Sequence, residues 1–155
     1  MLTKQHLNQP NAMSTDDRWH YVQYHWLKDL CSLPTTIPSR STLADALLWQ
    51  SIVPPEVDVQ QQAAFWFGSA SSRTPCHYDS YGCNLVAQHY GSKQWLLFPP
   101  TPSSEQLLQP TRIPFEESTV WAQTNLHDPS AADWSAQAWR VVLYPGDLLF
   151  VPHHW

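Results

Sequence analysis

The 155-residue sequence lacks the features of a membrane span and of a nucleic-acid surface. No apolar run approaches the roughly 20 residues that a helix needs to cross a bilayer. Charged residues make up only 14% of the chain, the Lys and Arg residues number eight, and the net charge is −5. Because these basic residues are scattered singly, no patch is suited to follow a phosphate backbone. We therefore expect neither a membrane nor a nucleic acid as a partner.

Cysteine and glycine are also scarce, with three and four residues respectively. An odd number of cysteines without a regular spacing does not indicate a disulfide framework. The N-terminal stretch MLTKQHLNQPNAMS is polar and lacks the apolar core of a signal peptide. Together these features predict an intracellular, reducing location, cytoplasmic or nuclear.

Apolar and aromatic residues, in contrast, are abundant. Hydrophobic residues make up 43% of the chain and nine residues are Trp, which is typical of a packed globular domain. The composition along the chain predicts a flexible tail at 1–13 and one domain at 14–155. Within that domain we expect a helical lead-in at 14–50 and a β region at 63–155.

The helical lead-in is predicted from capping residues and apolar spacing. Ser14 or Thr15 is a suitable N-cap, and Asp16 and Asp17 would follow in the first turn. Apolar residues then recur at helical spacing, at Trp19, Val22, Trp26 and Leu30. Prolines end this helix, and a second short helix is predicted from Thr42 to Trp49.

Short runs of aromatic and branched residues then predict strands. They are AAFWFG (63–68), NLVAQHY (84–90), KQWLLF (93–98), QAWRVVLY (137–144) and DLLFVP (147–152). Gly91-Ser92 is predicted to form a tight hairpin turn between the second and third runs. The proline-rich segment 99–118 is predicted to lack regular structure, with FEES as a solvated loop. Successive short strands of this kind favour a barrel or a double-sheet jelly roll.

The stretch His77-Tyr78-Asp79 is a candidate for metal binding. In an extended segment, residues i and i+2 point the same way, so the imidazole and the carboxylate can converge on one ion. A third ligand from a distant strand would complete a two-histidine, one-carboxylate face for Fe(II). The alternative is a surface turn, because His-x-Asp is common by chance.

Nearby polar residues strengthen the metal interpretation. Thr74 precedes the pair, Asn84 opens the next strand and Lys93 opens the strand after that. From strand periodicity, all three can face the barrel interior. A buried lysine and hydroxyl are reasonable if they hold a carboxylate ligand, because a lone buried ammonium is costly. The alternative for Lys93 is a solvated turn residue.

The segment TPCHYDSYGCNLVAQHYGSKQWLLFPP resembles the JmjC branch of the cupin-like oxygenases, and PTRIPFEES and YPGDLLFVPHHW fit the same pattern. The resemblance covers Ala63 to Trp155 and implies a double-stranded β-helix, also called a jelly roll or cupin fold. It implies that His77 and Asp79 bind Fe(II). It also implies that Thr74 and Lys93 bind the far carboxylate of 2-oxoglutarate, with Asn84 nearby.

The implied activity is that of a 2-oxoglutarate-dependent dioxygenase, which hydroxylates a C–H bond or demethylates an N-methyl group. The Asp at position 79 looks closer to protein hydroxylases than to lysine demethylases, many of which carry Glu. Within the family the motifs look most like members associated with small heat-shock proteins. The expected partner is therefore a protein substrate or a small heat-shock protein. The alternative is a non-catalytic interaction module with the same fold.

Two departures from the family pattern stand out. Many members have three residues between the Asp and the Asn, whereas SYGC makes four here. The family's second metal histidine is expected two residues beyond Trp155, so we expect a domain truncated at its C-terminus that is inactive alone. His153 and His154 are the alternatives for this ligand.

Cysteine chemistry offers two further alternatives. Cys76, His77, Asp79 and Cys83 contain the ligand types of a structural zinc site, although their spacing matches no common zinc module. Cys76 and Cys83 could also form a redox pair, but they lack the C-x-x-C spacing.

Overall fold

The computed structural model describes residues 19–26, 52–116, 118–128 and 134–155. It divides the chain into two compact units: one combines Met1–Met13 with Thr74–Trp155, and the other is Ser14–Arg73. The described part of the chain is mostly β, as predicted. None of its helices is long and apolar enough to cross a membrane. The predicted tail at 1–13 and the helix predicted from Thr42 to Trp49 lie outside the described residues.

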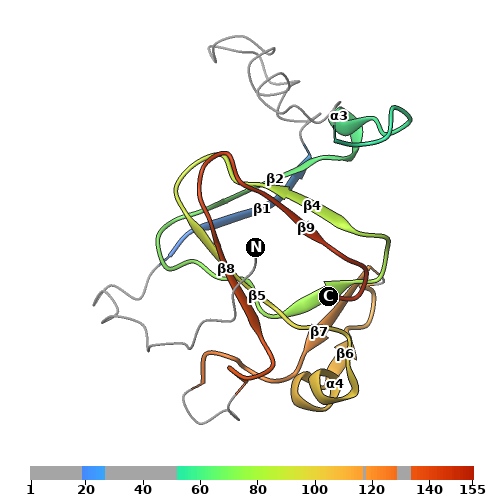
Figure 1. The fold of residues 1–155 in the computed structure, drawn as a ribbon, viewed down its shortest axis with the longest axis vertical. Coiled ribbons are helices and arrows are strands. Elements are labelled where there is room, and N and C mark those ends of the chain that lie inside the picture. Colours follow the sequence, from blue (N-terminus) through green and yellow to red (C-terminus); the bar gives the residue numbers. More distant parts are fainter. Residues whose placement is uncertain (1–18, 27–51, 117, 129–133) are drawn as a thin grey trace. The chain divides into compact units, whose positions relative to one another are not determined.

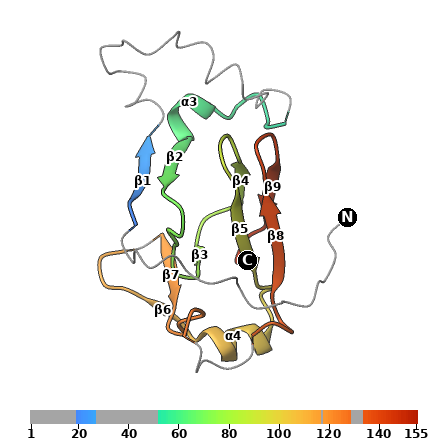
Figure 2. The ribbon, with the colours of Figure 1, turned by 90° about the vertical axis from the view of Figure 1, so that its left-hand side faces the viewer.

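The unit that contains Thr74–Trp155 is built on a long antiparallel ribbon. One side is β4 (Asn84–Ala87) followed by β5 (Lys93–Leu97), and the other is β8 (Trp139–Leu143) followed by β9 (Leu148–Val151). β4 pairs with β9 and β5 pairs with β8 (Figures 1 and 2). Such a ribbon, wound so that its two halves face each other, is the double-stranded β-helix that the sequence predicts.

The turns that connect the two halves of the ribbon are themselves joined. The backbone N–H of Gln88 donates to the Asp147 carbonyl, and the N–H of Gly146 donates to the Gln88 carbonyl. Gly91 in the first turn has φ +64°, a conformation that glycine adopts without a steric penalty. The predicted hairpin between 84–90 and 93–98 is therefore wrong, because this turn bends one side of the ribbon and the strands pair elsewhere.

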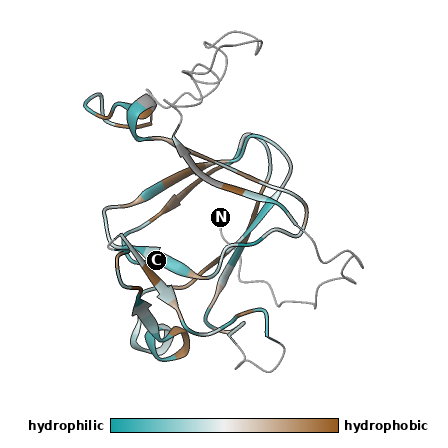
Figure 3. Cartoon of the chain, turned by 180° about the vertical axis from the view of Figure 1, so that it is seen from behind, coloured by the Kyte–Doolittle hydropathy of each residue, from teal (hydrophilic) through white to brown (hydrophobic). Residues whose placement is uncertain are grey.

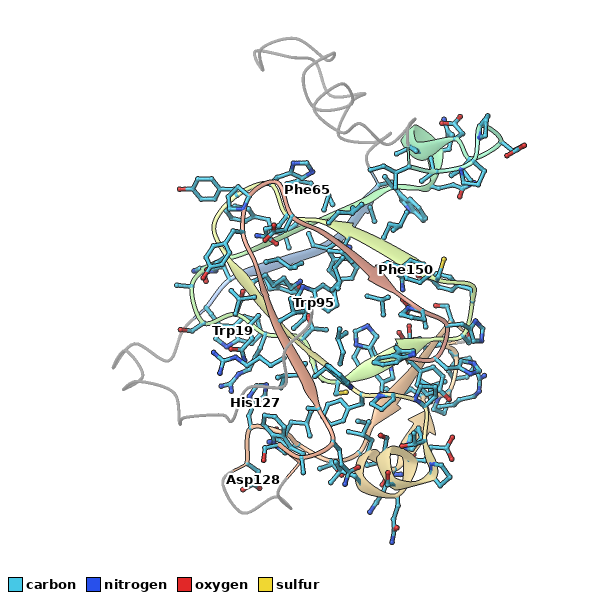
Figure 4. The ribbon with its side chains drawn as sticks, viewed as in Figure 1. Trp19, Phe65, Trp95, His127, Asp128 and Phe150 are labelled. Atoms are coloured by element: carbon cyan, nitrogen blue, oxygen red, sulfur yellow. The ribbon has the colours of Figure 1, made fainter. Side chains whose placement is uncertain are left out.

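The core of this unit lies between the two halves of the ribbon. Its buried members come from β5, β8 and β9, and they are Leu97, Leu143, Leu149 and Val151. Val86 and Trp95 pack against this cluster, whereas Phe150 lies on the opposite face of β9 with 55% of its surface exposed. Trp95 and Phe150 are labelled in Figure 4. Figure 3 shows hydrophobic and hydrophilic residues interleaved along the strands, as expected where one face is buried and the other is exposed.

A second sheet in the same unit carries the candidate site. Its strands are β3 (His77–Asp79), β7 (Thr119–Ala122) and β6 (Pro110–Arg112), in the order β3-β7-β6. All pairs are antiparallel, and His77 lies opposite Trp121 while Asp79 lies opposite Thr119. We call these three strands the ligand sheet.

The prediction that 99–118 lacks regular structure is wrong. Helix α4 (Pro102–Leu108) and strand β6 fall within it. Thr101 caps the helix by accepting a hydrogen bond from the Ser104 N–H, and Pro102 occupies the first turn. Proline is well tolerated there because its missing N–H would have no partner within the helix.

The unit Ser14–Arg73 contains an antiparallel pair, β1 (Tyr21–Trp26) and β2 (Ala64–Gly68), and the short helix α3 (Val59–Gln62). The helix predicted from Ser14 to Leu30 is wrong over 21–26, which form β1. The sequence YVQYHW is rich in aromatic and β-branched residues, and its pairing with AFWFG outweighs the helical spacing. Gly68 has no room for a side chain, because a Cβ there would meet the Tyr21 ring at 2.9 Å.

Candidate metal centre

His77 is held in a defined orientation on β3. Its Nδ1 lies 2.9 Å from the carbonyl oxygen of Pro75. Since a carbonyl can only accept, Nδ1 carries the hydrogen, and Nε2 is the nitrogen with the lone pair in the neutral ring. A backbone carbonyl on the far nitrogen is a common way to fix the tautomer of a metal-binding histidine. His77 is half-buried, so its free nitrogen suits a metal ion.

Asp79 is oriented by Asn84. The Asn84 side-chain N–H donates to Oδ2 of Asp79 at 2.7 Å. This bond fixes the plane of the carboxylate, so that Oδ1 remains as a ligand atom. It also shows that the four-residue loop Ser80–Cys83 closes in a way that brings Asn84 back to Asp79, despite the additional residue. Gly82 in this loop has φ +25°.

Trp121 packs against His77 from the neighbouring strand. The two rings have centroids 4.7 Å apart and an interplanar angle of 37°. The Trp121 indole N–H in turn donates to Oε2 of Glu116 at 3.1 Å. Glu116 is half-buried, so at this position the expected solvated loop is instead part of the support for the histidine.

Asn84 and Lys93 lie on the faces of their strands that the sequence predicts. Asn84 is opposite Val151, and Lys93 is opposite Leu143, and both of these partners belong to the core cluster. Lys93 is half-buried, and its Nζ lies 4.9 Å from the centroid of the Trp95 ring. This cation–π contact is one way to keep an ammonium group inside a fold. Thr74 is half-buried in the segment that leads to β3.

The two C-terminal histidines have other partners. The His154 ring lies 5.0 Å from the ring of Tyr78, and Nδ1 of His153 lies 3.0 Å from the Gly82 carbonyl oxygen. Tyr78 points to the opposite face of β3 from His77 and Asp79. Across the described ranges, no three His, Cys, Asp or Glu side chains form a group that could hold a metal ion. Hence neither histidine joins His77 and Asp79 in a three-ligand group in this structure.

The lack of a three-ligand group among the described residues also argues against the alternative zinc site. Cys76, His77, Asp79 and Cys83 are all described, and the structure does not bring three of them together. Cys76 and Cys83 are both free thiols. Burial raises the pKa of the Cys76 thiol to about 11, so it stays protonated near neutral pH, unlike the thiolate that binds zinc.

Sequence reasoning missed three supports of the candidate site: the Pro75 carbonyl, Trp121 and Glu116. The carbonyl carries no signal in its residue type. Trp121 lies in STVWA, a run with the aromatic and β-branched residues of a strand, and this signal could have predicted β7. Its pairing with β3, more than 40 positions earlier, is decided by the fold.

A bent antiparallel ribbon, with a His-x-Asp pair on a separate three-stranded sheet, indicates a jelly-roll protein of the cupin class. The sequence matches the cupin-like domain family over residues 4–155, and the chain belongs to this family. No solved structure matches the chain.

Among curated proteins, the chain is similar to HSPB1-associated protein 1 of Homo sapiens, with 39% identity over 88% of this chain and 27% of that protein. It is 36% identical to the Danio rerio homologue over 88% of this chain and 29% of that protein. It is 31% identical to lysine-specific demethylase JMJ31 of Arabidopsis thaliana over 59% of this chain and 17% of that protein. The predicted resemblance to JmjC proteins is confirmed. The chain spans less than a third of these relatives.

Proposed function

We propose that this domain belongs to an Fe(II)- and 2-oxoglutarate-dependent oxygenase of the protein-hydroxylase type. The observation that carries the proposal is that two possible metal-binding side chains on β3 are held in fixed orientations by hydrogen bonds. Nε2 of His77 is left with its lone pair by the Pro75 carbonyl, and Asp79 is oriented by Asn84. One imidazole nitrogen and one carboxylate oxygen are donor types that suit Fe(II).

The residues of this chain fit the implied cofactors. His77 and Asp79 would hold the iron, and Lys93 and Thr74 would bind the far carboxylate of 2-oxoglutarate. Iron with 2-oxoglutarate and oxygen would supply the oxidation of a C–H bond of the substrate. Trp121 supports the His77 ring, and Asn84 keeps the Asp79 carboxylate from rotating. The third ligand expected from the family pattern would follow Trp155.

A second candidate function is a non-catalytic module that binds a small heat-shock protein. It is favoured by the similarity to HSPB1-associated protein 1, which covers 88% of this chain at 39% identity. The name of the relative HSPB1-associated protein 1 indicates the partner class. For either function we propose an intracellular location.

The test uses the chain extended past Trp155 to include the histidine expected two residues beyond it. The extended protein is expected to convert 2-oxoglutarate to succinate in the presence of Fe(II) and oxygen. His77→Ala should abolish succinate formation, and His89→Ala, at an exposed position, should not. Absence of succinate from the extended wild type would contradict the oxygenase proposal. Calorimetric binding of a purified small heat-shock protein, unchanged by His77→Ala, would then favour the interaction module.

A further inference from the structure

The turn that follows β9 contacts the segment that carries the metal ligands at two separate points. Nδ1 of His153 lies 3.0 Å from the Gly82 carbonyl oxygen, and the His154 ring lies 5.0 Å from the Tyr78 ring. The two histidine rings are themselves 3.7 Å apart. The three rings are tilted against one another, at 52° and 57°, and form a continuous series of contacts from the turn at Pro152–Trp155 to the middle of β3.

The position of His153 follows from the register of the ribbon. Asn84 lies opposite Val151 at the end of the β4–β9 pairing. Gly82 is two residues before Asn84, and His153 is two residues after Val151. If the antiparallel register continued past its last backbone pair, these two residues would lie opposite each other, and the side chain of His153 makes a hydrogen bond there. Because the Gly82 oxygen only accepts, Nδ1 of His153 is the donor.

Both contacts act on the residues that hold Asp79. The loop Ser80–Cys83 connects Asp79 to Asn84, whose amide orients the carboxylate. His153 fixes the middle of this loop. Tyr78 lies between the two ligands in sequence and points to the other face of β3, where His154 packs against it. His154 has φ +63°, a conformation that non-glycine residues adopt at a steric cost, so the surrounding contacts must hold it.

We infer that His153 and His154 are positioning residues, which fasten the turn Pro152–Trp155 to the loop Ser80–Cys83 and to Tyr78 and thereby hold Asp79 ready for a metal ion. The fastening itself is a property of the metal-free chain. Its effect on metal affinity rests on the proposed function.

Hydrogen exchange of the metal-free 155-residue chain tests the fastening. The Ser80 N–H donates to the Ser118 carbonyl at the end of β3, so its exchange reports on the loop. His153→Ala is expected to speed exchange in 80–83 by about 2- to 10-fold, as expected for the loss of one hydrogen bond. His153→Asn places an amide N–H where Nδ1 was and should restore the wild-type rate, whereas His153→Leu should not.

Cobalt(II) titration of the chain extended past Trp155, followed by visible absorption, tests the effect on the candidate ligands. His153→Ala and His154→Ala are expected to weaken cobalt binding by about 3- to 10-fold, less than the loss typical for a residue that is hydrogen-bonded directly to a metal ligand. His153→Asn should bind cobalt like the wild type. His89→Ala is the matched control, since it removes an exposed histidine beyond the opposite end of β4. Hydrogen exchange in β5, measured for the same variants, confirms that each variant is folded.

Each outcome decides the inference. Unchanged loop exchange in His153→Ala, or equally fast exchange in His153→Asn, would overturn it. Faster loop exchange with unchanged cobalt affinity would also overturn it, because His153 would then hold the loop without positioning a ligand. If the wild type binds no cobalt, the ion-site proposal fails on its own, and the exchange rates of the three His153 variants still decide the fastening.

Discussion

The ribbon and the ligand sheet of the Thr74–Trp155 unit differ in what holds them together. The ribbon encloses the buried apolar residues Leu97, Leu143, Leu149 and Val151. All three residues of β3 in the ligand sheet are only half-buried, and two are polar and fixed by hydrogen bonds to Pro75 and Asn84. Apolar burial provides most of the stability of a fold, whereas partly exposed polar groups are available to a ligand. The difference indicates that the apolar core of the ribbon and the two candidate metal ligands lie on separate strands.

The largest expected effect is on stability, from Leu143→Ala in the ribbon. Leu143 is 4% exposed, so truncation leaves a cavity and should lower the free energy of unfolding by about 2–5 kcal/mol. Phe150→Ala, on the outward face of the same ribbon, should cost far less because its side chain is exposed. Urea denaturation measures both. Equal losses would contradict the assignment of the core to the inward face.

Asn84→Ala should weaken metal binding strongly and lower stability little, which is the opposite of the effect expected for Leu143→Ala. Without the amide that orients Asp79, metal affinity should fall by about 10- to 100-fold, while the free energy of unfolding should fall by only about 1–2 kcal/mol. Cobalt titration and urea denaturation of the same preparation separate the two effects. Gln94→Ala, at an exposed position of β5, is the control. A large loss of stability with unchanged metal binding would refute the separation of roles.

Helix α4 lies in the chain between β5 of the ribbon and β6 of the ligand sheet. A change at its N-cap should lower the stability by a smaller amount. Thr101→Ala removes the N-cap bond to the Ser104 N–H and should cost about 1 kcal/mol. Thr101→Ser should retain most of the stability because its hydroxyl can accept the same bond. Thermal unfolding by circular dichroism compares the variants. If Thr101→Ser is as unstable as Thr101→Ala, the capping hydroxyl is not the cause.

The two cysteines that flank the candidate metal ligands should differ in reactivity. Cys83 is exposed, whereas burial raises the pKa of the Cys76 thiol from 9.0 to about 11. Iodoacetamide near pH 8 should therefore modify Cys83 first, as peptide mass spectrometry would show. The unfolded Cys76 thiol ionises near 9.0 and the folded one near 11, so its contribution to stability is lost as the pH rises through this interval. Similar labelling rates would contradict the burial of Cys76.

Much of the β region was predictable, because strand signals are local. Runs such as AFWFG and LLFV show their character within a few residues. The helix expected over 21–26 failed because YVQYHW satisfies two patterns, and pairing with β2 decided between them. Helix α4, which the prediction for 99–118 missed, had a signal in the sequence, because Thr101 and Pro102 form a good helix start.

The sequence by itself determined the family and the placement of His77 and Asp79 on one face, because side-chain alternation along a strand needs no other part of the chain. Only the tertiary structure decided that β4 pairs with β9, that Asn84 reaches Asp79, and that His153 reaches Gly82. Most of these contacts join residues far apart in the chain. They form because burying the apolar face of the ribbon fixes its register, and the register then places the polar groups beside it.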